Sequence, residues 1–378
     1  MRVDVCLPPV SQQNRKEEYE LINVGIDVGK RICQAALKAD DGRLLDELRF
    51  ENTSQGVQEL IKHITVHGEA RAVLESTGNY WIRIHDTLEE HSINTLLANP
   101  RKTKLIAEAK IKSDKLDART LATLLQGNLV FESYVPPKTK QEDRTLFRHR
   151  ASLSKMRTEI RNRIHAILAK HELQYDYSDL FGKKGSEWLR SLRLEGVDEV
   201  VLKTNLTLLR TLDEQVEAVT VQIAKTACNQ EDIRILMTLP GIDFYSAMVI
   251  ASEIGDVKRF PTQWKLVAYA GLAPRIHQSG EYERRGGITK EGSKWLRWIL
   301  VQAAQHARQH DPRFKAYYER VARRRGSHKA VVAVAKEMLV VTWFMLTRRE
   351  AYRGQNTELV ERKLKRMNNL AHPGLQAA

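Results

Sequence analysis

The order of strand and helix patterns in the first third of the chain is the feature that most limits its fold. Five runs rich in β-branched and apolar residues have the length and composition of strands, at residues 22–28, 32–38, 44–50, 70–75 and 93–98. Helical periodicity fills the intervals after the third run, at residues 54–66, 80–90, 101–110 and 114–126. Three consecutive strands followed by alternating helices and strands predict a mixed α/β domain.

This order matches that of a ribonuclease-H-like domain. Asp40, Asp41 and Gly42 provide the hairpin turn between the second and third strands. In that fold the first strand runs through the centre of the sheet and carries the first metal ligand, although a fold analogy alone does not establish a site. We therefore predict an α/β ribonuclease-H-like domain over residues 21–130, preceded by a polar extension of residues 1–20.

Four carboxylates occupy the positions in this domain where a metal site is expected. Asp27 and Glu75 each follow an apolar strand pattern, while Asp114 and Asp117 lie one turn apart on a helix that Ser113 can cap. Taken singly, each is more simply explained as a turn former or a charge that complements a helix dipole. Together they predict a pair of Mg²⁺ ions about 4 Å apart that clamp a phosphodiester. Two neighbouring cations, Lys115 and Arg119, are then candidates for phosphate contact.

Beyond a proline-containing linker at residues 131–137, two stretches show sevenfold apolar recurrence. The recurring positions are Leu146, Leu153, Ile160 and Ile167 in the first stretch and Leu202, Leu209, Val216 and Ile223 in the second. This spacing predicts a coiled-coil arm over residues 138–228, with two ordinary amphipathic helices as the alternative. The first stretch also carries eight cations, which favours phosphate-backbone contact. They are Arg144, Arg148, Arg150, Lys155, Arg157, Arg161, Arg163 and Lys170.

A mainly helical C-terminal domain is predicted over residues 232–350, with a flexible tail at residues 354–378. The segment Leu239-Pro240-Gly241-Ile242 resembles the turn of a helix-hairpin-helix, whose backbone N–H groups bind phosphate. Asp243 replaces the usual second glycine and adds a negative charge, so a packed helical turn is the alternative. Trp295 and Trp298 occur at helical spacing, and we expect them in the core rather than as platforms for stacked bases.

Ser279 stands before Gly280 in a segment that we expect to be a flexible loop. A serine hydroxyl is a weak nucleophile until a base, a metal or nearby cations activate it, and cations also stabilise a pentavalent transition state. Ser-Gly pairs are common in loops, so spacing alone makes Ser279 only a weak candidate, and His277 nearby is more simply a solvated side chain. The cations around Ser279 are Arg275, Arg284, Arg285, Lys290, Lys294 and Arg297.

The overall composition agrees with a nucleic-acid enzyme. A net charge of +14 and a pI of about 9.6 predict a polyanionic partner, and an acidic protein substrate or an anionic membrane surface would fit less well. The three cysteines have no spacing typical of a metal site or disulfide framework, and the first 20 residues lack the apolar core of a signal peptide. The longest nearly apolar run, at residues 338–346, is too short to span a bilayer and predicts a buried helix. We expect a soluble cytoplasmic protein without a membrane partner.

Five segments together resemble the DEDD-type transposases of the IS-one-ten class of insertion sequences. They are Val24-Gly25-Ile26-Asp27-Val28-Gly29-Lys30, Glu75-Ser76-Thr77-Gly78, Lys112-Ser113-Asp114-Lys115-Leu116-Asp117-Ala118, Leu239-Pro240-Gly241-Ile242, and Tyr269-Ala270-Gly271-Leu272-Ala273-Pro274 through Gly292. Their order and spread cover residues 21 to 350. The departures are Asp243 and the extension before Leu21, and neither touches the expected catalytic set.

The resemblance implies a RuvC-like nuclease domain, a coiled-coil arm and a C-terminal transposase domain. It implies that Asp27, Glu75, Asp114 and Asp117 bind Mg²⁺ and that Ser279 is the catalytic serine, forming a phosphoserine link to DNA. It further implies donor and target DNA as substrates, a structured non-coding bridge RNA as guide, and a tetramer built as a dimer of dimers. The nucleic-acid contacts that we expect are Arg148, Arg157, Arg161, Arg275, Arg284, Arg285, Lys290, Lys294 and Arg297.

Two other functions fit the same residues. In a Holliday-junction-type endonuclease the four acids activate water and Ser279 takes no part. In a non-enzymatic architectural protein the basic arm and the helical hairpin bind nucleic acid and the acids are structural. A covalent DNA–protein adduct distinguishes the transposase from the first, and a requirement for Asp27 and Asp114 distinguishes it from the second.

Overall fold

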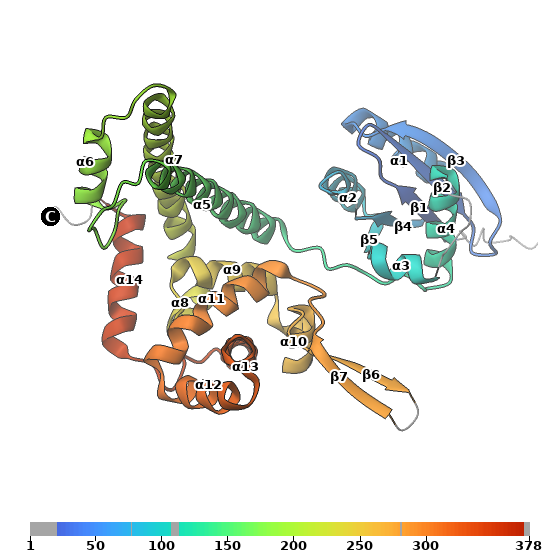
Figure 1. The fold of residues 1–378 in the computed structure, drawn as a ribbon. Helices are drawn as coiled ribbons and strands as arrows, with labels where there is room; N and C mark the ends of the chain where they lie inside the picture. Colours follow the sequence, from blue (N-terminus) through green and yellow to red (C-terminus); the bar gives the residue numbers. More distant parts are fainter. Residues whose placement is uncertain (1–20, 77, 107–112, 280–281, 374–378) are drawn as a thin grey trace, which may run out of the picture. The chain divides into compact units, whose positions relative to one another are not determined.

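The computed structural model describes residues 21–76, 78–106, 113–279 and 282–373, with the backbone alone at residues 276–279 and 282–285. These residues form two compact units that divide between Val135 and Pro136 (Figure 1). Each unit has its own hydrophobic core.

The N-terminal unit is built on a five-stranded mixed sheet. Its strands are β1 (Ile22–Asp27), β2 (Ile32–Lys38), β3 (Leu44–Glu51), β4 (Ala70–Glu75) and β5 (Asn94–Ala98). They are ordered β3-β2-β1-β4-β5, with β1 antiparallel to β2 and parallel to β4. This order places β1 at the centre of the sheet, and the unit fits the predicted ribonuclease-H-like domain.

Helices cover both faces of this sheet (Figure 1). The helices of this unit are α1 (Ser54–His67), α2 (Trp81–Glu90), α3 (Pro100–Ile106) and α4 (Asp114–Gln126), of which α1, α2 and α4 pack on the sheet. One face of β1 and β4 packs with α1 and α2 through side chains such as Val24, Leu60 and Ile84. The opposite face packs with α4, where Val73 meets Leu121. Alternate residues of β1 and β4 therefore face α4, because successive side chains of a strand point to opposite faces.

The C-terminal unit is mainly helical, as predicted. Its helices are α5 (Lys138–Lys170), α6 (Lys183–Ser191), α7 (Val197–Ala227), α8 (Glu231–Met237), α9 (Phe244–Ile254), α10 (Gln263–Tyr269), α11 (Lys294–His310), α12 (Pro312–Arg325), α13 (Ser327–Arg348) and α14 (Thr357–Ala371). The long helices α5 and α7 pack on each other and enclose apolar side chains together with α6. Coiled-coil geometry in this arm stays a prediction.

The prediction of a loop around Ser279 was wrong. Residues Pro274–Ser279 and Tyr282–Ile288 form the strands β6 and β7 of a two-stranded antiparallel hairpin. Thr289 N donates to Ala273 O at 2.9 Å and continues the pairing at the hairpin base. The charged residues and the Gly286-Gly287 pair hide the strand pattern, because they interrupt the apolar alternation by which a half-buried strand is recognised.

The prediction of a flexible tail over residues 354–378 was also wrong for residues 357–371, which form α14. Asn356 caps this helix by accepting a hydrogen bond from Leu359 N at 3.0 Å. Val360, Met367 and Ala371 are buried, and the helix packs on α7. These apolar positions are separated by helical intervals within a polar sequence. The polarity averaged over the segment therefore did not reveal that it forms an amphipathic helix.

The predicted buried apolar helix is part of α13. By length and composition this helix could cross a membrane, yet over half of its most apolar stretch is buried within the C-terminal unit. Ala330, Val334 and Met338 are fully buried in the core. This burial is typical of the central helix of a globular unit, and α13 is such a helix.

Candidate functional site

Two of the four predicted acids end neighbouring parallel strands of the N-terminal unit. Ile26 on β1 pairs with Leu74 on β4, and the next residues along the two strands are Asp27 and Glu75. Because the carboxyl ends of parallel strands meet at one edge, the two acids share that edge. Strand alternation also gives Asp27 the face of Gly25, and Glu75 the face of Val73, which is the face covered by α4.

Helix α4 runs antiparallel to β1 and carries the other two acids to the same edge. A Cβ atom at Gly25 would overlap the Ala118 carbonyl and the Ala122 amide, so the helix touches the strand backbone there. The far end of α4 lies at the start of β4, where Arg71 Nη2 donates to Leu125 O at 3.1 Å. From the contact at Gly25, Asp27 lies about 7 Å along the strand and Asp114 lies about 6 Å along the helix in the same direction. Asp117 precedes the contact residue Ala118.

The fold therefore places the four acids at one edge of the sheet, but their side chains do not form a closed cluster. Asp27, Glu75 and Asp117 are half-buried and Asp114 is exposed. No three acidic, histidine or cysteine side chains within the described residues are arranged to hold a metal ion. The donor set consists of carboxylate oxygens, which suits a hard cation such as Mg²⁺ better than Zn²⁺.

Cys33 lies beside this edge without joining the donor set. Its Sγ is 3.7 Å from Gly29 O, and the side chain is buried. Burial raises the pKa of the Cys33 thiol to about 11, and the Asp27 carboxylate adds to the rise. The thiol is therefore protonated at neutral pH, which makes it a poor metal ligand and a poor nucleophile.

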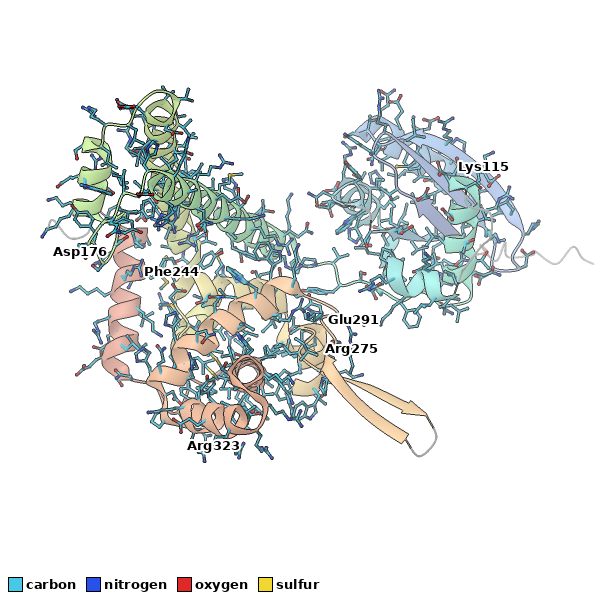
Figure 2. The ribbon with its side chains drawn as sticks, in the orientation of Figure 1. Lys115, Asp176, Phe244, Arg275, Glu291 and Arg323 are labelled. Atoms are coloured by element: carbon cyan, nitrogen blue, oxygen red, sulfur yellow. The ribbon has the colours of Figure 1, made fainter. Side chains whose placement is uncertain are left out.

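Arg119 is paired with Glu47 within the N-terminal unit, and its contact with phosphate stays a prediction. Its Nε and Nη2 donate to the two carboxylate oxygens of Glu47, both at 2.7 Å. The Arg119 guanidinium holds the pKa of the Glu47 carboxyl below its usual range. This paired geometry ties α4 to β3, while Lys115 remains exposed on the same helix (Figure 2).

Ser279 is the last residue of β6 in the C-terminal unit. Its backbone pairs with Tyr282 across the end of the hairpin. Arg284 and Arg285 lie opposite His277 and Ile276 on β7, so the cationic residues share this hairpin. Two other predicted contacts brace its base: Arg275 Nη2 donates to Thr289 O at 3.2 Å, and Arg297 Nη1 donates to Ala270 O at 2.9 Å. Arg275 is exposed where β6 begins (Figure 2).

Three predicted nucleic-acid contacts on α5 have partners inside the C-terminal unit. Arg148 Nη2 donates to Glu253 Oε1 at 2.6 Å, and Arg157 Nη1 donates to Asp213 Oδ1 at 3.2 Å. The Arg161 guanidinium lies over the Phe181 ring, 4.8 Å from its centroid. Lys290 and Lys294, by contrast, are exposed. Contact with nucleic acid stays a prediction for all of these side chains.

The helical hairpin α8–α9 has the geometry of a packed turn. Asp243 caps α9 by accepting from Ser246 N at 2.8 Å, so its carboxylate occupies the helix N-terminus where a phosphate would bind. Lys363 from α14, which sequence reasoning missed, donates to Met237 O at 2.7 Å and to Ile242 O at 2.8 Å. These contacts support the alternative of a packed helical turn.

Trp298 differs from its sequence-based prediction. Trp295 packs against the core as expected, with its ring edge-on to Trp298 at a centroid distance of 5.7 Å. Trp298, however, is 40% exposed. Helical spacing identified the shared helix, but it could not show that the described residues of the C-terminal unit leave this ring partly exposed.

Comparison with known proteins assigns both units to one family. Residues 24–172 match the model of the DEDD transposases of the IS110 class, described as "Transposase", and residues 233–319 match the model described as "Transposase IS116/IS110/IS902 family". The two matches together cover well over half of the chain and include all four acids and Ser279.

Relatives in several bacteria align over most of their length. The transposase for insertion sequence element IS1111A of Coxiella burnetii is 25% identical over 91% of this chain and 94% of its own. The transposase for IS1328 of Yersinia enterocolitica is 24% identical over 86% and 96%. The pilin gene-inverting protein of Moraxella bovis is 24% identical over 85% and 95%. The chain belongs to the IS110 class of DEDD transposases, a family of enzymes that move insertion sequences in DNA.

Proposed function

We propose that this transposase is guided by RNA and exchanges DNA strands through a serine nucleophile, Ser279, assisted by Mg²⁺ on Asp27, Glu75, Asp114 and Asp117. The single observation that carries the proposal is the meeting of the ends of β1 and β4 with the start of α4 at one sheet edge. Four carboxylates at one edge of a basic protein are suited to a phosphodiester substrate.

The proposed chemistry is a reversible transesterification. The Ser279 Oγ attacks the scissile phosphorus and loses its proton, a phosphorus–oxygen bond forms, and the bond from phosphorus to the 3′ oxygen breaks. The released strand keeps a 3′ hydroxyl, and the enzyme holds the 5′ phosphate as a phosphoserine. A 3′ hydroxyl of another strand then attacks that phosphorus and frees the serine. Two strands are exchanged without hydrolysis.

Different parts of the protein support different steps of this proposal. When bound, Mg²⁺ supplies charge neutralisation at the phosphate oxygens. The cationic residues of the β6–β7 hairpin, among them Arg284 and Arg285, are suited to stabilise the negative charge of the pentavalent phosphorus. The relative that is named a pilin gene-inverting protein supports strand exchange, since inversion rejoins the ends that it cuts.

The proposed partners are a bridge RNA, further copies of the chain, and donor and target DNA. Guidance by a bridge RNA and assembly as a dimer of dimers are supported by the family resemblance, and a net charge of +14 suits a protein that binds both RNA and DNA. Donor and target DNA are the proposed substrates, and the cytoplasm, where bacterial DNA resides, is the proposed compartment.

The nucleophile can be tested with end-labelled DNA that carries the element's junction, incubated with the full chain, Mg²⁺ and RNA from the same locus. We expect wild-type protein to produce a DNA band whose mobility is shifted on a denaturing gel and restored by protease. Ser279→Ala should remove this band entirely, because no other group forms the link. The matched control Ser152→Ala changes an exposed serine on α5 and should retain it.

The same gel separates the proposal from the endonuclease alternative. If Ser279→Ala cuts DNA at the wild-type rate and leaves free ends without an adduct, the acids activate water and the serine role is wrong. Asp27→Asn should abolish cutting under both mechanisms. Normal recombination by Asp27→Asn would contradict the catalytic role of the acidic edge.

A further inference from the structure

A groove of about 930 Å³ lies in the C-terminal unit, away from the β6–β7 hairpin residues. Residues of α5, the turn before α9, α11 and the start of α14 line it. Pockets of about 300–1,000 Å³ accept ligands of the size of a drug molecule. The groove is therefore large enough for a few nucleotides and too small to enclose a duplex.

One wall is a stripe of ring and amide side chains on α11. Trp298, Gln302, His306 and His310 follow one another at four-residue intervals, and all four are exposed and line the groove. Residues four apart lie on the same side of a helix. The opposite side of α11, with Leu300 and Ala304, is buried in the core. The core therefore fixes the direction in which the stripe faces.

The side chains in this stripe are of the kinds that contact bases. An exposed tryptophan offers a flat surface on which a base can stack regardless of its sequence. Gln302 and His306 follow Trp298 at one-turn intervals and can hydrogen-bond to base edges. Edge-on contact with Trp295 restrains the Trp298 ring, which reduces the entropy lost when a base stacks on it.

The other walls of the groove are positively charged. Arg150, Lys155 and Arg362 line them, and the one carboxylate in the lining, Asp243, is engaged in capping α9. Arg150 Nε donates to Thr220 Oγ1 at 2.7 Å, and its guanidinium lies 4.3 Å from the centroid of the Tyr245 ring. This cation is consequently held in place beside the groove. Positive walls that face a base-stacking stripe match the alternation of phosphate and base in a single strand.

We propose that this groove, the α11 groove, binds an unpaired segment of nucleic acid. At least one base stacks on Trp298, and phosphates lie toward Arg150, Lys155 and Arg362. The inference deepens the proposed function by assigning a single-strand contact site outside the proposed catalytic residues. Unpaired DNA and unpaired RNA share the chemistry that the groove recognises, and the experiment distinguishes them.

The test measures binding of the full chain to fluorescent 12-nucleotide single strands by anisotropy, with DNA, RNA and blunt duplex DNA as separate probes. We expect Trp298→Ala to weaken single-strand binding about 5- to 150-fold, the range for loss of one stacked base. The matched control Trp264→Ala changes another exposed tryptophan, on α10, and should alter binding less than twofold. The more strongly affected single-strand probe identifies the occupant as DNA or RNA.

A second pair of variants tests the groove without removing a large side chain. Gln302→Glu places a negative charge in the lining and should weaken binding at least fivefold at low salt, with a smaller effect at high salt. Gln305→Glu adds the same charge to α11 outside the lining and should have little effect. Equal effects of the two substitutions would show that only overall charge matters and would overturn the proposal, as would loss of duplex binding without loss of single-strand binding.

The outcome is independent of the nucleophile test. Trp298→Ala is tested beside Ser279→Ala in the two assays. Loss of single-strand affinity in Trp298→Ala would support the groove, and a normal protein–DNA adduct band in Ser279→Ala would reject the serine role. Unchanged single-strand affinity in both Trp298→Ala and Gln302→Glu would reject the groove, whatever the adduct assay gives.

Discussion

Lys363 is a single side chain that joins distant parts of the C-terminal unit. It extends from α14 to three carbonyl oxygens of the turn between α8 and α9, those of Met237, Leu239 and Ile242. Burial lowers the pKa of Lys363 to about 8, against an opposing effect of the nearby Asp243 carboxylate. The contact joins α14 to the turn between α8 and α9.

This contact predicts a pH dependence of stability. Since the folded state releases the Lys363 proton near pH 8 and the unfolded chain near pH 10.4, the unfolded chain binds more protons between these values. The part of the stability that is linked to this proton is therefore present above about pH 10 and lost as pH falls toward 8, while the hydrogen bonds to the three carbonyls remain at lower pH. Lys363→Met removes the donor from three carbonyls and should lower the free energy of unfolding by about 1–3 kcal/mol at pH 7.

Urea unfolding followed by tryptophan fluorescence measures this effect, because five of the six tryptophans lie in the C-terminal unit. The gap between wild type and Lys363→Met should widen as pH rises from 7 to 10. A gap that stays constant with pH would show that the Lys363 proton is not linked to folding. Lys365→Met, at an exposed position on α14, is the control and should show neither effect.

At the scale of elements, the close approach of α4 to β1 determines where the acids lie. The contact is possible because residue 25 is a glycine and because Ala118 and Ala122 present small side chains to the strand. The exchange of hydrogen bonds between Arg119 and Glu47 fixes the same helix to β3. The positions of Asp114 and Asp117 thus depend on residues that carry no catalytic chemistry.

Gly25→Ala should separate these elements and reduce activity together with local stability. The added Cβ overlaps helix backbone rather than a flexible side chain, so we expect a loss of about 1–3 kcal/mol and little adduct formation. Hydrogen–deuterium exchange should show faster exchange in peptides of α4 and β1. The control Gly127→Ala lies at the other end of α4, where a Cβ meets only ordinary contacts, and should exchange as wild type does. Normal protection of α4 in Gly25→Ala would contradict this account.

Elements whose apolar pattern matched their burial could be predicted from the sequence. The bounds of β2, β4 and α4 agree with the predicted ranges, and Ser113 caps α4 as expected by accepting from Leu116 N at 3.3 Å. The hairpin β6–β7 could not be predicted, since charges and glycines interrupt its strands. The partners of Arg119 and Arg148 could not be predicted either, because Glu47 and Glu253 lie 72 and 105 residues away in sequence.

At the scale of the whole molecule, the proposed chemistry is divided between two units. The acidic edge belongs to the N-terminal unit, and Ser279 belongs to the C-terminal unit. Linker residues 131–135 are largely fastened to the N-terminal unit, where Asn99 N donates to Phe131 O at 2.8 Å and Ser133 N donates to Leu97 O at 2.6 Å. The remaining connection to α5 is Pro136-Pro137, which is short and stiff.

Because the acids and the serine lie on separate units and the family resemblance implies an oligomer, we predict that the acids of one protomer act with the serine of another. Asp27→Asn and Ser279→Ala proteins are each expected to be inactive. Unfolded together and refolded as an equimolar mixture, they should recover about a quarter of wild-type adduct formation, because in paired protomers one of the two sites in each mixed dimer is intact. Sites built within one chain would give no recovery. Wild type mixed with the Asp27→Asn/Ser279→Ala double variant supplies the opposite control: sites shared between chains should retain about a quarter of the activity, and sites within one chain about half.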